Sequence, residues 1–305
     1  MESKFPISYQ YLNVLRRRVE PRPRKVVIHP ELTCPESCRE GYAALVFNLE
    51  FGGDVNRHLS SNIIQANYQD GFLNDYGLHH FHLGSGIESN GKSKGFVKRT
   101  GPVLLAYITE NIAYLIDIKV HGMCGDPYIW TDQNIIEKLH NEWPHSIEQF
   151  RFKRVLASGV IPTQNEKKEL RKSGVNTAIE MPDGTLYMSP GGGVTCAKTS
   201  TKLQIDYNIF MIELKEALRQ LVDFICKEPS LSHHIVKLKL VSIFDGYFFH
   251  DSINRVTYRI IFDRNKANRT ITVYRWGSFP DYYLTIFEFN RLAKIIPCCA
   301  SDTLL

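Results

Sequence analysis

The chain has 305 residues, a length that suits two domains or one large domain with an inserted lobe. Hydrophobic residues make up 43% of it and aromatic residues 11%, which excludes a mainly disordered protein. The formal net charge of +5 fits an anionic partner such as nucleic acid, but it is also common in proteins that have no such partner.

The cysteine content and the apolar runs indicate a cytoplasmic protein. The seven cysteines are odd in number and follow no regular spacing, and no signal-peptide pattern precedes them. No apolar run in the sequence approaches the roughly 20 residues that a helix needs to cross a bilayer. We therefore expect reduced thiols, a reducing compartment and no membrane-spanning segment.

Residues 1–58 are predicted to form a basic N-terminal arm and a helix. Prolines divide residues 5–30 into extended segments, among which 25–29 has the character of a short strand. The three arginines at 16–18 belong either to a solvated arm or to an arm that follows the phosphates of a nucleic acid. Apolar residues at three- and four-residue spacing predict a helix over 36–51, which two glycines end.

Residues 59–150 have the pattern of a mixed helix and sheet domain, which we take as the candidate catalytic part. The expected elements are a helix at 56–67, a glycine-punctuated loop at 70–77, a strand of histidines from 79, and strands at 103–108 and 112–118. Only three residues separate the last two strands, which are rich in branched and aromatic side chains. They therefore predict a tight antiparallel hairpin.

Residues 151–305 are assigned to a C-terminal lobe, with a boundary at 150–165. A capping-box pattern at 163–166 opens a charged helix, Pro182-Asp183-Gly184 predicts a hairpin, and 204–226 is the longest helical pattern. Beyond these, strands are expected at 235–244, 246–250, 255–262, 269–275 and 282–288, as an antiparallel meander. The predicted fold class is α+β, with antiparallel sheets and flanking helices in two lobes.

The histidine strand carries the strongest functional signal. Alternation along a strand places His80 and His82 on one face, whereas Phe81 and Leu83 should face the core. His121 follows the last strand of the hairpin, and the basic loop between the histidine strand and the hairpin ends in Arg99. Imidazoles transfer protons near neutral pH and guanidinium groups hold phosphate, so these residues predict chemistry on a phosphodiester.

Taken together, the strand His-x-Phe-His-Leu, the basic loop and the hairpin resemble the sheet of RelE-type ribonuclease toxins, members of the barnase, EndoU, colicin and RelE-like superfamily. The resemblance covers residues 60–145, under a third of the chain, and is one of pattern. These toxins are often a third of this length, and most carry an arginine or lysine in place of the histidine pair. The resemblance implies a metal-independent endoribonuclease in which the ribose 2′-hydroxyl attacks the adjacent phosphate.

Carried over by position, the resemblance makes His80 or His82 the general base or acid and Arg99 the phosphate clamp, with His121 beside the leaving oxygen. Substrate-binding residues near the clamp would be the following: Lys98, Thr100 and Tyr107. No cofactor is expected. RNA is the favoured partner, and an inhibitory or regulatory protein is a second one.

Two other functions fit parts of the same pattern. A metal-dependent nuclease could use His80, His82, His121 and Asp75 as ligands, although we rank it below the metal-free enzyme. A non-catalytic module could bind nucleic acid or protein through the basic arm and through the aromatic and arginine side chains of the C-terminal sheet. The glycine run 191–193 lacks the ending of a P-loop, so a flexible turn is favoured there.

The sequence therefore predicts a cytoplasmic RNA-cleaving effector or toxin, of the kind that serves in antiviral defence. It does not predict the oligomeric state or the cleavage sequence.

Overall fold

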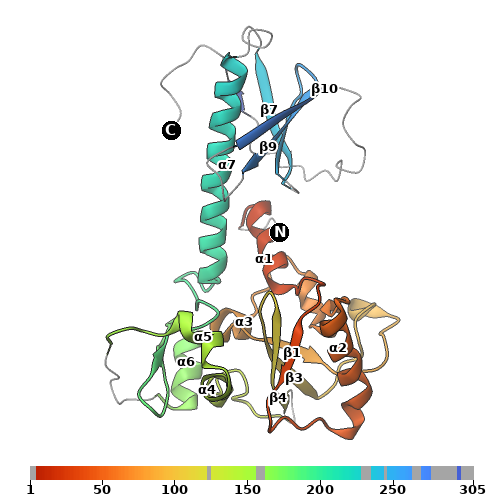
Figure 1. Cartoon of the computed structure of the whole chain (residues 1–305), viewed down its shortest axis with the longest axis vertical. Coiled ribbons are helices and arrows are strands. Elements are labelled where there is room, and N and C mark those ends of the chain that lie inside the picture. Colours follow the sequence, from red (N-terminus) through yellow and green to blue (C-terminus); the bar gives the residue numbers. More distant parts are fainter. Residues whose placement is uncertain are drawn as a thin grey trace. The chain divides into compact units, whose positions relative to one another are not determined.

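The computed structural model describes residues 5–121, 125–155, 162–227, 235–243, 246–262, 269–275 and 294–296. Two units are present, Met1–Tyr207 and Asn208–Leu305, and they divide within the long helix α7, Thr201–Lys227 (Figure 1). Helices and sheets containing antiparallel strands confirm the α+β class. Among the described helices, none is both long enough and apolar enough to span a membrane.

The first unit is built around one sheet of four strands. In space the strand order is β1-β4-β3-β2, where β2 pairs antiparallel with β3, β3 pairs antiparallel with β4, and β1 pairs parallel with β4. The bounds of these strands are β1 Lys25–Ile28, β2 His79–His82, β3 Pro102–Ile108 and β4 Ile112–Val120. The predicted hairpin is confirmed as β3 and β4, but the sheet is mixed because β1 joins it in parallel.

Helices cover both faces of this sheet. The helices of the first unit before α7 are α1 Ile7–Arg17, α2 Arg39–Phe51, α3 Gly71–Tyr76, α4 Asn134–Glu142, α5 Pro144–Ile147 and α6 Gln164–Lys172. Short 3₁₀ turns lie at Glu36–Cys38, Asn56–His58, Ser61–Ile64, Gly91–Ser93 and Glu148–Phe150, and a small hairpin pairs β5, Ile179–Glu180, with β6, Leu186–Tyr187. Figure 1 shows α2 on one side of the sheet and α4 and α5 on the other.

Two apolar cores result from this layering. On one face Leu45 and Leu49 of α2 pack with Phe81 and Leu104 of the sheet. On the other face the helix α4 packs against Val103, Leu105 and Tyr107 of β3. Successive side chains of a strand point to opposite faces, so the apolar residues of β3 from Val103 to Ile108 alternate between the two cores. Burial on both faces distinguishes this sheet from one that has a solvated side.

Helix α2 approaches the end of β2 so closely at Gly41 that adding a single methyl group there should lower the free energy of unfolding. A Cβ atom at Gly41 would lie 2.0 Å from the carbonyl oxygen of Leu83. Because backbone must move to admit it, Gly41→Ala should lower the free energy of unfolding by about 2 kcal/mol or more, despite the better helix propensity of alanine. Gly71→Ala is the control, since nothing lies within 4 Å of its Cβ position. A urea titration in which both variants unfold alike would contradict this packing.

The N-terminal region differs from the sequence prediction. Residues 7–17 form the helix α1 and not an extended segment, whereas the predicted strand is confirmed as β1. Arg17, 2% exposed, donates to the carbonyl oxygens of Asn13, Asn62 and Gln65. The prolines that guided the prediction lie after this helix. Arg17 is therefore not part of a solvated arm, because its buried guanidinium group is hydrogen-bonded to main-chain carbonyl groups.

The segment between α2 and the histidine strand also differs. The expected helix at 56–67 is replaced by two 3₁₀ turns, and the expected loop at 70–77 contains α3. The side chain of Asp70 caps α3 by accepting from the amide of Leu73, and Gly77 ends it in the left-handed conformation. The sequence signals at Asp70 and Gly77, which predicted a loop, are therefore the N-terminal and C-terminal caps of the short helix α3.

The predicted boundary at 150–165 is not where the two units divide. Residues 156–161 lie outside the described residues, and those from 162 to 207 belong to the first unit. The capping box of Thr163 and Glu166 is confirmed at the start of α6. The segment 1–58 is also part of this unit, because it supplies β1 and α2 to the central sheet.

The second unit contains a five-stranded antiparallel sheet in the order β10-β9-β8-β7-β11. Its strands are β7 Val236–Ser242, β8 Tyr247–Asp251, β9 Val256–Phe262, β10 Arg269–Arg275 and β11 Lys294–Ile296. The first four follow one another as the predicted meander, and the strand expected at 282–288 lies outside the described residues. Phe248 and Tyr258 are buried, so these two aromatic side chains pack the sheet and are closed to a stacked base.

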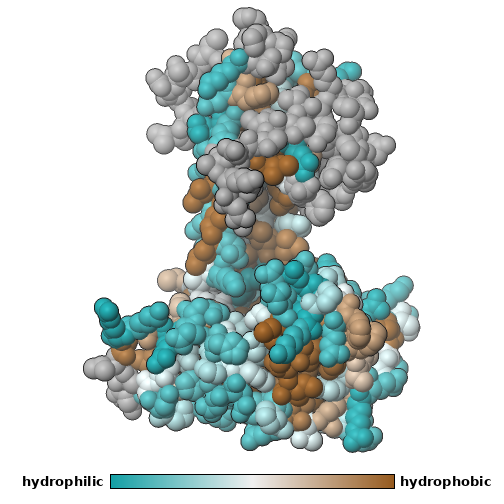
Figure 2. All heavy atoms as spheres, in the orientation of Figure 1, coloured by the Kyte–Doolittle hydropathy of each residue, from teal (hydrophilic) through white to brown (hydrophobic). Residues whose placement is uncertain are grey.

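Helix α7 buries a narrower face than its pattern predicted. Its buried residues follow one helical stripe, which consists of Leu203, Phe210, Leu214, Ala217, Leu221 and Ile225. Ile205, Ile209 and Ile212 are exposed, and Figure 2 shows hydrophobic side chains along this helix. Isoleucines therefore stand on two faces of α7, and the described residues cover the face of Ile225 but not that of Ile205, Ile209 and Ile212.

Candidate active site

The strand register brings the two histidines of β2 onto the face that carries the core of α4 and α5. His80 pairs with Leu105 and His82 pairs with Val103, and both partners belong to that core. Phe81, which alternates with them, lies in the opposite core. The predicted alternation is therefore confirmed, but the expectation that His82 would face solvent or a cleft is wrong. His82 is only 1% exposed, because α4 and its flanking segments cover this face.

Three imidazole rings meet at the end of the sheet. The ring centroids of His80 and His82 are 6.5 Å apart, and those of His82 and His121 are 5.3 Å apart. His121 reaches this position because it directly follows β4, where its amide donates to the carbonyl oxygen of Gly101 at 3.0 Å. Trp130 closes the group, with its ring 5.0 Å from that of His80 and 5.9 Å from that of His121. We call His80, His82, His121 and Trp130 the histidine cluster.

Several ring nitrogens in the histidine cluster are buried without a hydrogen-bond partner among the described residues. They are Nδ1 of His80, both nitrogens of His82 and Nε2 of His121. Buried polar atoms in folded proteins almost always have a partner, so an unpaired group needs an explanation. An imidazole that must exchange a proton with a substrate is one such explanation, because its nitrogens have to stay free until the substrate arrives.

The environment keeps these imidazoles neutral. Burial is the main cause that lowers the pKa of His82 to about 3, and the charges of Arg99 and the neighbouring imidazoles act in the same direction. The carbonyl group of Thr100 opposes this shift, although no described group reaches hydrogen-bond geometry with the ring. Burial also lowers the pKa of His80 and that of His121. A neutral imidazole has a free nitrogen that can accept a proton, but a lowered pKa also makes it a weaker base than an ordinary histidine.

Arg99 lies within electrostatic range of the histidine cluster and is exposed. Its positive charge acts to lower the pKa of His80, His82 and His121, in each case behind burial, which is the main cause. It comes from the loop that joins β2 to β3. Of the four residues for which the sequence predicted catalytic roles, His80, His82 and His121 lie together, whereas no hydrogen bond or ion pair joins Arg99 to them in the described part of the chain.

The predicted substrate-binding residues have other surroundings. The hydroxyl of Thr100 donates to the carbonyl oxygen of Pro102 and accepts from the amide of Leu83, so it links β2 to β3. The backbone of Lys98 is tied to Gly86, while its side chain is exposed. Tyr107 is 8% exposed and packs on Tyr114 in the core. Of these three residues, only Lys98 offers an exposed charged group.

An ion network holds the segment that carries Trp130. Lys119 forms an ion pair with Asp132, which lies two residues after Trp130 in the chain. Asp117 is 3.0 Å from Lys138 of α4 and 3.9 Å from Lys119. Residues 117, 119 and 121 of β4 and its extension share one face, so this network lies beside His121. The network therefore positions the wall of the histidine cluster.

The ligand set expected for a metal-dependent nuclease is not assembled. Asp75 forms an ion pair with Arg171 and accepts a hydrogen bond from Ser189, and no contact joins it to the histidine cluster. Across the described ranges, no three His, Cys, Asp or Glu side chains are placed to share one metal ion. Of the four predicted metal ligands, only the three histidines lie close together.

Two residues of the site were missed from the sequence. Trp130 lies in an irregular segment with no motif around it, and only its packing on His80 and His121 reveals it. His58 is buried, and its Nδ1 donates to the carbonyl oxygen of His82 at 2.9 Å, which steadies the end of β2. Neither position carries a local signal, since both depend on contacts distant in sequence.

Comparisons of the chain with protein-family models, with curated proteins and with solved structures found no match.

Proposed function

We propose that the protein is a metal-independent endoribonuclease, acting as an effector or toxin, with the histidine cluster as its catalytic centre. The observation that carries the proposal is the convergence of His80, His82 and His121, whose buried ring nitrogens lack partners among the described residues. Arg99 is an exposed cation whose charge acts on the same rings. Attack of a ribose 2′-hydroxyl on the adjacent phosphate requires a proton acceptor and a cation that binds the phosphate, and this set contains both. The resemblance to RelE-type toxins supports the same reaction.

In the proposed reaction, one neutral imidazole takes the proton of the ribose 2′-hydroxyl. The oxygen attacks the adjacent phosphorus, the bond from phosphorus to the 5′-oxygen breaks, and a 2′,3′-cyclic phosphate forms. A second imidazole returns a proton to the leaving 5′-oxygen. Because an anionic phosphate nearby favours the charged form of histidine, substrate binding raises the pKa of the cluster and lets one ring hold that proton.

Arg99 is the proposed phosphate ligand. A guanidinium group can donate two parallel hydrogen bonds to a phosphate, which stabilises the charge that develops in the transition state. The neighbouring side chain of Lys98 is exposed and adds a second positive charge to the same loop. The catalytic roles of the histidines and of Arg99 follow from this proposal.

The test is incubation of the purified protein with labelled RNA and with DNA of the same sequence. Cleavage of RNA that survives EDTA and leaves a cyclic phosphate end is the expected result, since DNA lacks the attacking hydroxyl. Loss of cleavage in EDTA with recovery on addition of zinc or manganese would instead support the metal-dependent alternative. Binding of RNA without cleavage between about pH 5 and 9, the range over which histidines titrate, would support a binding module.

Substitution of Arg99 tests the phosphate contact. We expect Arg99→Ala to lower kcat/KM for RNA by about 100-fold or more, in line with the loss of one charge-stabilising group. Arg99→Lys should retain part of the rate, because the charge remains while the bidentate geometry is lost. Arg39→Ala, an exposed residue at the start of α2, is the control. Equal rates for Arg99→Ala and the unmodified protein would remove Arg99 from the mechanism.

A further inference from the structure

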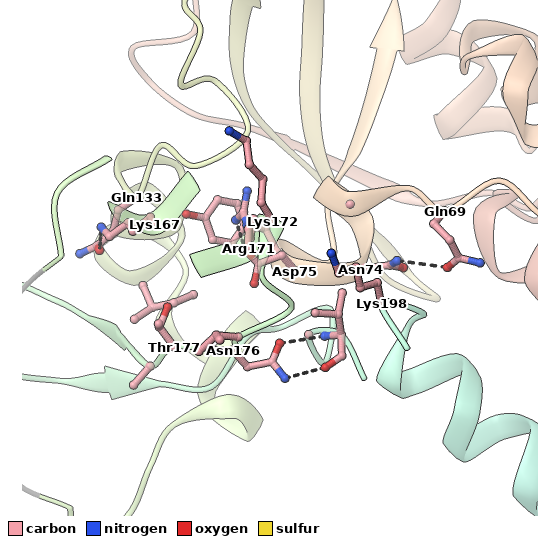
Figure 3. A pocket seen from close by; sticks show the side chains of 17 residues that line it. Gln69, Asn74, Asp75, Gln133, Lys167, Arg171, Lys172, Asn176, Thr177 and Lys198 are labelled. Carbon is pink, nitrogen blue, oxygen red and sulfur yellow. Dashed lines mark hydrogen bonds and ion pairs between the residues drawn. The ribbon is translucent and has the colours of Figure 1, made fainter. Parts of the chain in front are cut away.

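A separate cavity of the first unit has no part in the histidine cluster. Its volume is about 290 Å³, close to the lower end of the range of about 300–1,000 Å³ for small-molecule sites. In Figure 3 side chains from α3, from α6 and from the segment before α7 surround it. No residue of the histidine cluster lines it.

The charged side chains around this cavity are mostly basic. Helix α6 supplies Lys167, Arg171 and Lys172, the segment before α7 supplies Lys198, and Asp75 is the one acid among the described lining residues. The lining therefore carries a formal excess of three positive charges. A phosphomonoester has a charge of about −1.5 to −2 at pH 7, which this excess can balance.

The four cations are not equally available. Arg171 is held by its ion pair with Asp75 and lies 4.7 Å from the ring centroid of Tyr76. Lys167 donates to the side chain of Gln133 at 2.6 Å, and two carboxylates outside the lining act on it.

Lys172 pairs with Glu169 on the exposed side of α6. Lys198 is exposed and has no partner among the described residues. It is therefore the cation best able to take up a new anion.

An unpaired donor lies at the same cavity. Nε2 of Gln69 is buried without a hydrogen-bond partner among the described residues, while its Oε1 accepts from Asn74 at 3.5 Å. Figure 3 shows Gln69, Asn74 and Lys198 on one side of the cavity. A buried amide donor without an acceptor is costly unless a ligand supplies one. Figure 3 shows the Oε1 of Gln69 toward Asn74 and its Nε2 on the far side, away from the other lining side chains, so this donor is not counted among the contacts of a ligand.

The glycine run 191–193 shapes this cavity without cradling an anion through its amides. The amides of Gly191, Gly192 and Gly193 donate to the carbonyl oxygens of Asp75, Ser189 and Asn74. A Cβ atom at Gly191 would lie 2.2 Å from the carbonyl oxygen of Leu73, so glycine is needed for the chain to approach α3. Side chains and not backbone amides are therefore left to hold an anion here.

We propose that this cavity binds a phosphomonoester of the size of a nucleoside monophosphate. Lys198 contacts the phosphate, and Arg171 and Lys167 supply the surrounding positive potential. The organic part packs on the apolar lining, which includes Tyr76, Val175 and Ile179. This inference is independent of the ribonuclease proposal, because it concerns other residues and is tested by binding alone.

The experiment is calorimetric titration of the full-length protein with AMP, with adenosine and with inorganic phosphate. Saturable binding of AMP, competition by inorganic phosphate and much weaker binding of adenosine are the expected results. Equal binding of AMP and adenosine would overturn phosphate recognition, and absence of saturable AMP binding up to millimolar concentration would overturn the site.

Two matched variants locate the binding. Lys198→Gln keeps the length of the side chain and removes its charge, and we expect it to raise the Kd for AMP about tenfold or more. Lys153→Gln removes an exposed charge of the same unit away from the cavity and should leave the Kd unchanged within about twofold. An equal effect of the two variants would show attraction by net charge only and would reject this cavity as the site.

Discussion

Replacement of His82 by asparagine should lower the rate of RNA cleavage by about 10²–10⁴-fold, the range typical of the loss of a general acid or base. His82 lies at the centre of the histidine cluster, with His121 5.3 Å and His80 6.5 Å away between ring centroids. Asparagine keeps a polar side chain of smaller volume but cannot accept and return a proton at neutral pH. The rate is measured under single-turnover conditions, so that product release does not mask the chemical step.

Burial of His82 requires a second variant that separates catalysis from folding. His121 is less buried, so His121→Asn tests the same cluster with less risk to packing. The control is His145→Asn, because His145 is exposed on α5 and contacts Tyr114 outside the cluster. If His82→Asn and His121→Asn remain folded and cleave RNA as fast as the control, the histidine cluster is not the catalytic centre.

The pH dependence of RNA cleavage should also show whether the histidine cluster supplies the general base. A general base must be neutral, and the pKa values of His80, His82 and His121 are lowered from the ordinary value near 6.5. The acidic limb of kcat/KM, which reports the free enzyme, should therefore lie below pH 6.5. An acidic limb at or above that pH would assign the base to a group outside the cluster.

Acid should destabilise the first unit steeply below pH 6.5. Burial lowers the pKa of His79 to about 4 and that of His82 to about 3. In the unfolded chain both groups take up protons near pH 6.5, whereas in the folded chain they resist protonation until the lower pKa is reached. Stability is therefore full above pH 6.5, and each histidine removes about 3 kcal/mol of it by pH 4.

Together these two groups account for about 6 kcal/mol, which is comparable to the whole stability of many domains. The measurement is the free energy of unfolding in urea at several pH values, followed by the fluorescence of Trp130 and Trp143, which lie in this unit. His79→Gln removes one titrating group that lies outside the proposed catalytic set. Between pH 6.5 and 4 the free energy of unfolding of the His79→Gln variant should therefore fall by about 3 kcal/mol less than that of the unmodified protein. Identical pH profiles would contradict the burial of neutral His79.

Local patterns of the sequence predicted the elements whose causes are local. The hairpin of β3 and β4, the end of α2 at Gly52 and the capping box at Thr163 all depend on residues a few positions apart. The period of two along β2 was enough to place His80 and His82 on one face. These predictions succeed because turn chemistry, capping and alternation do not depend on distant packing.

Contacts distant in the sequence decided the remaining features. Nothing near residue 17 indicates that its guanidinium will hold carbonyl groups of residues 62 and 65, and so α1 was missed. The parallel addition of β1 beside β4 also depends on a connection that the local pattern does not specify. In the same way, the cavity of Lys198 and Gln69 exists only because α3, α6 and the segment before α7 meet there.

The sequence by itself determined which residues could form the candidate site, because the chemistry of imidazole and guanidinium and the alternation of a strand are written in residue type and spacing. Only the tertiary structure decided the state of those residues. Helices cover both faces of the sheet, so His82 is buried and neutral where the alternation alone predicted contact with solvent or a cleft. The physical reason is that a pKa depends on desolvation, and desolvation is set by whichever segments pack over the side chain.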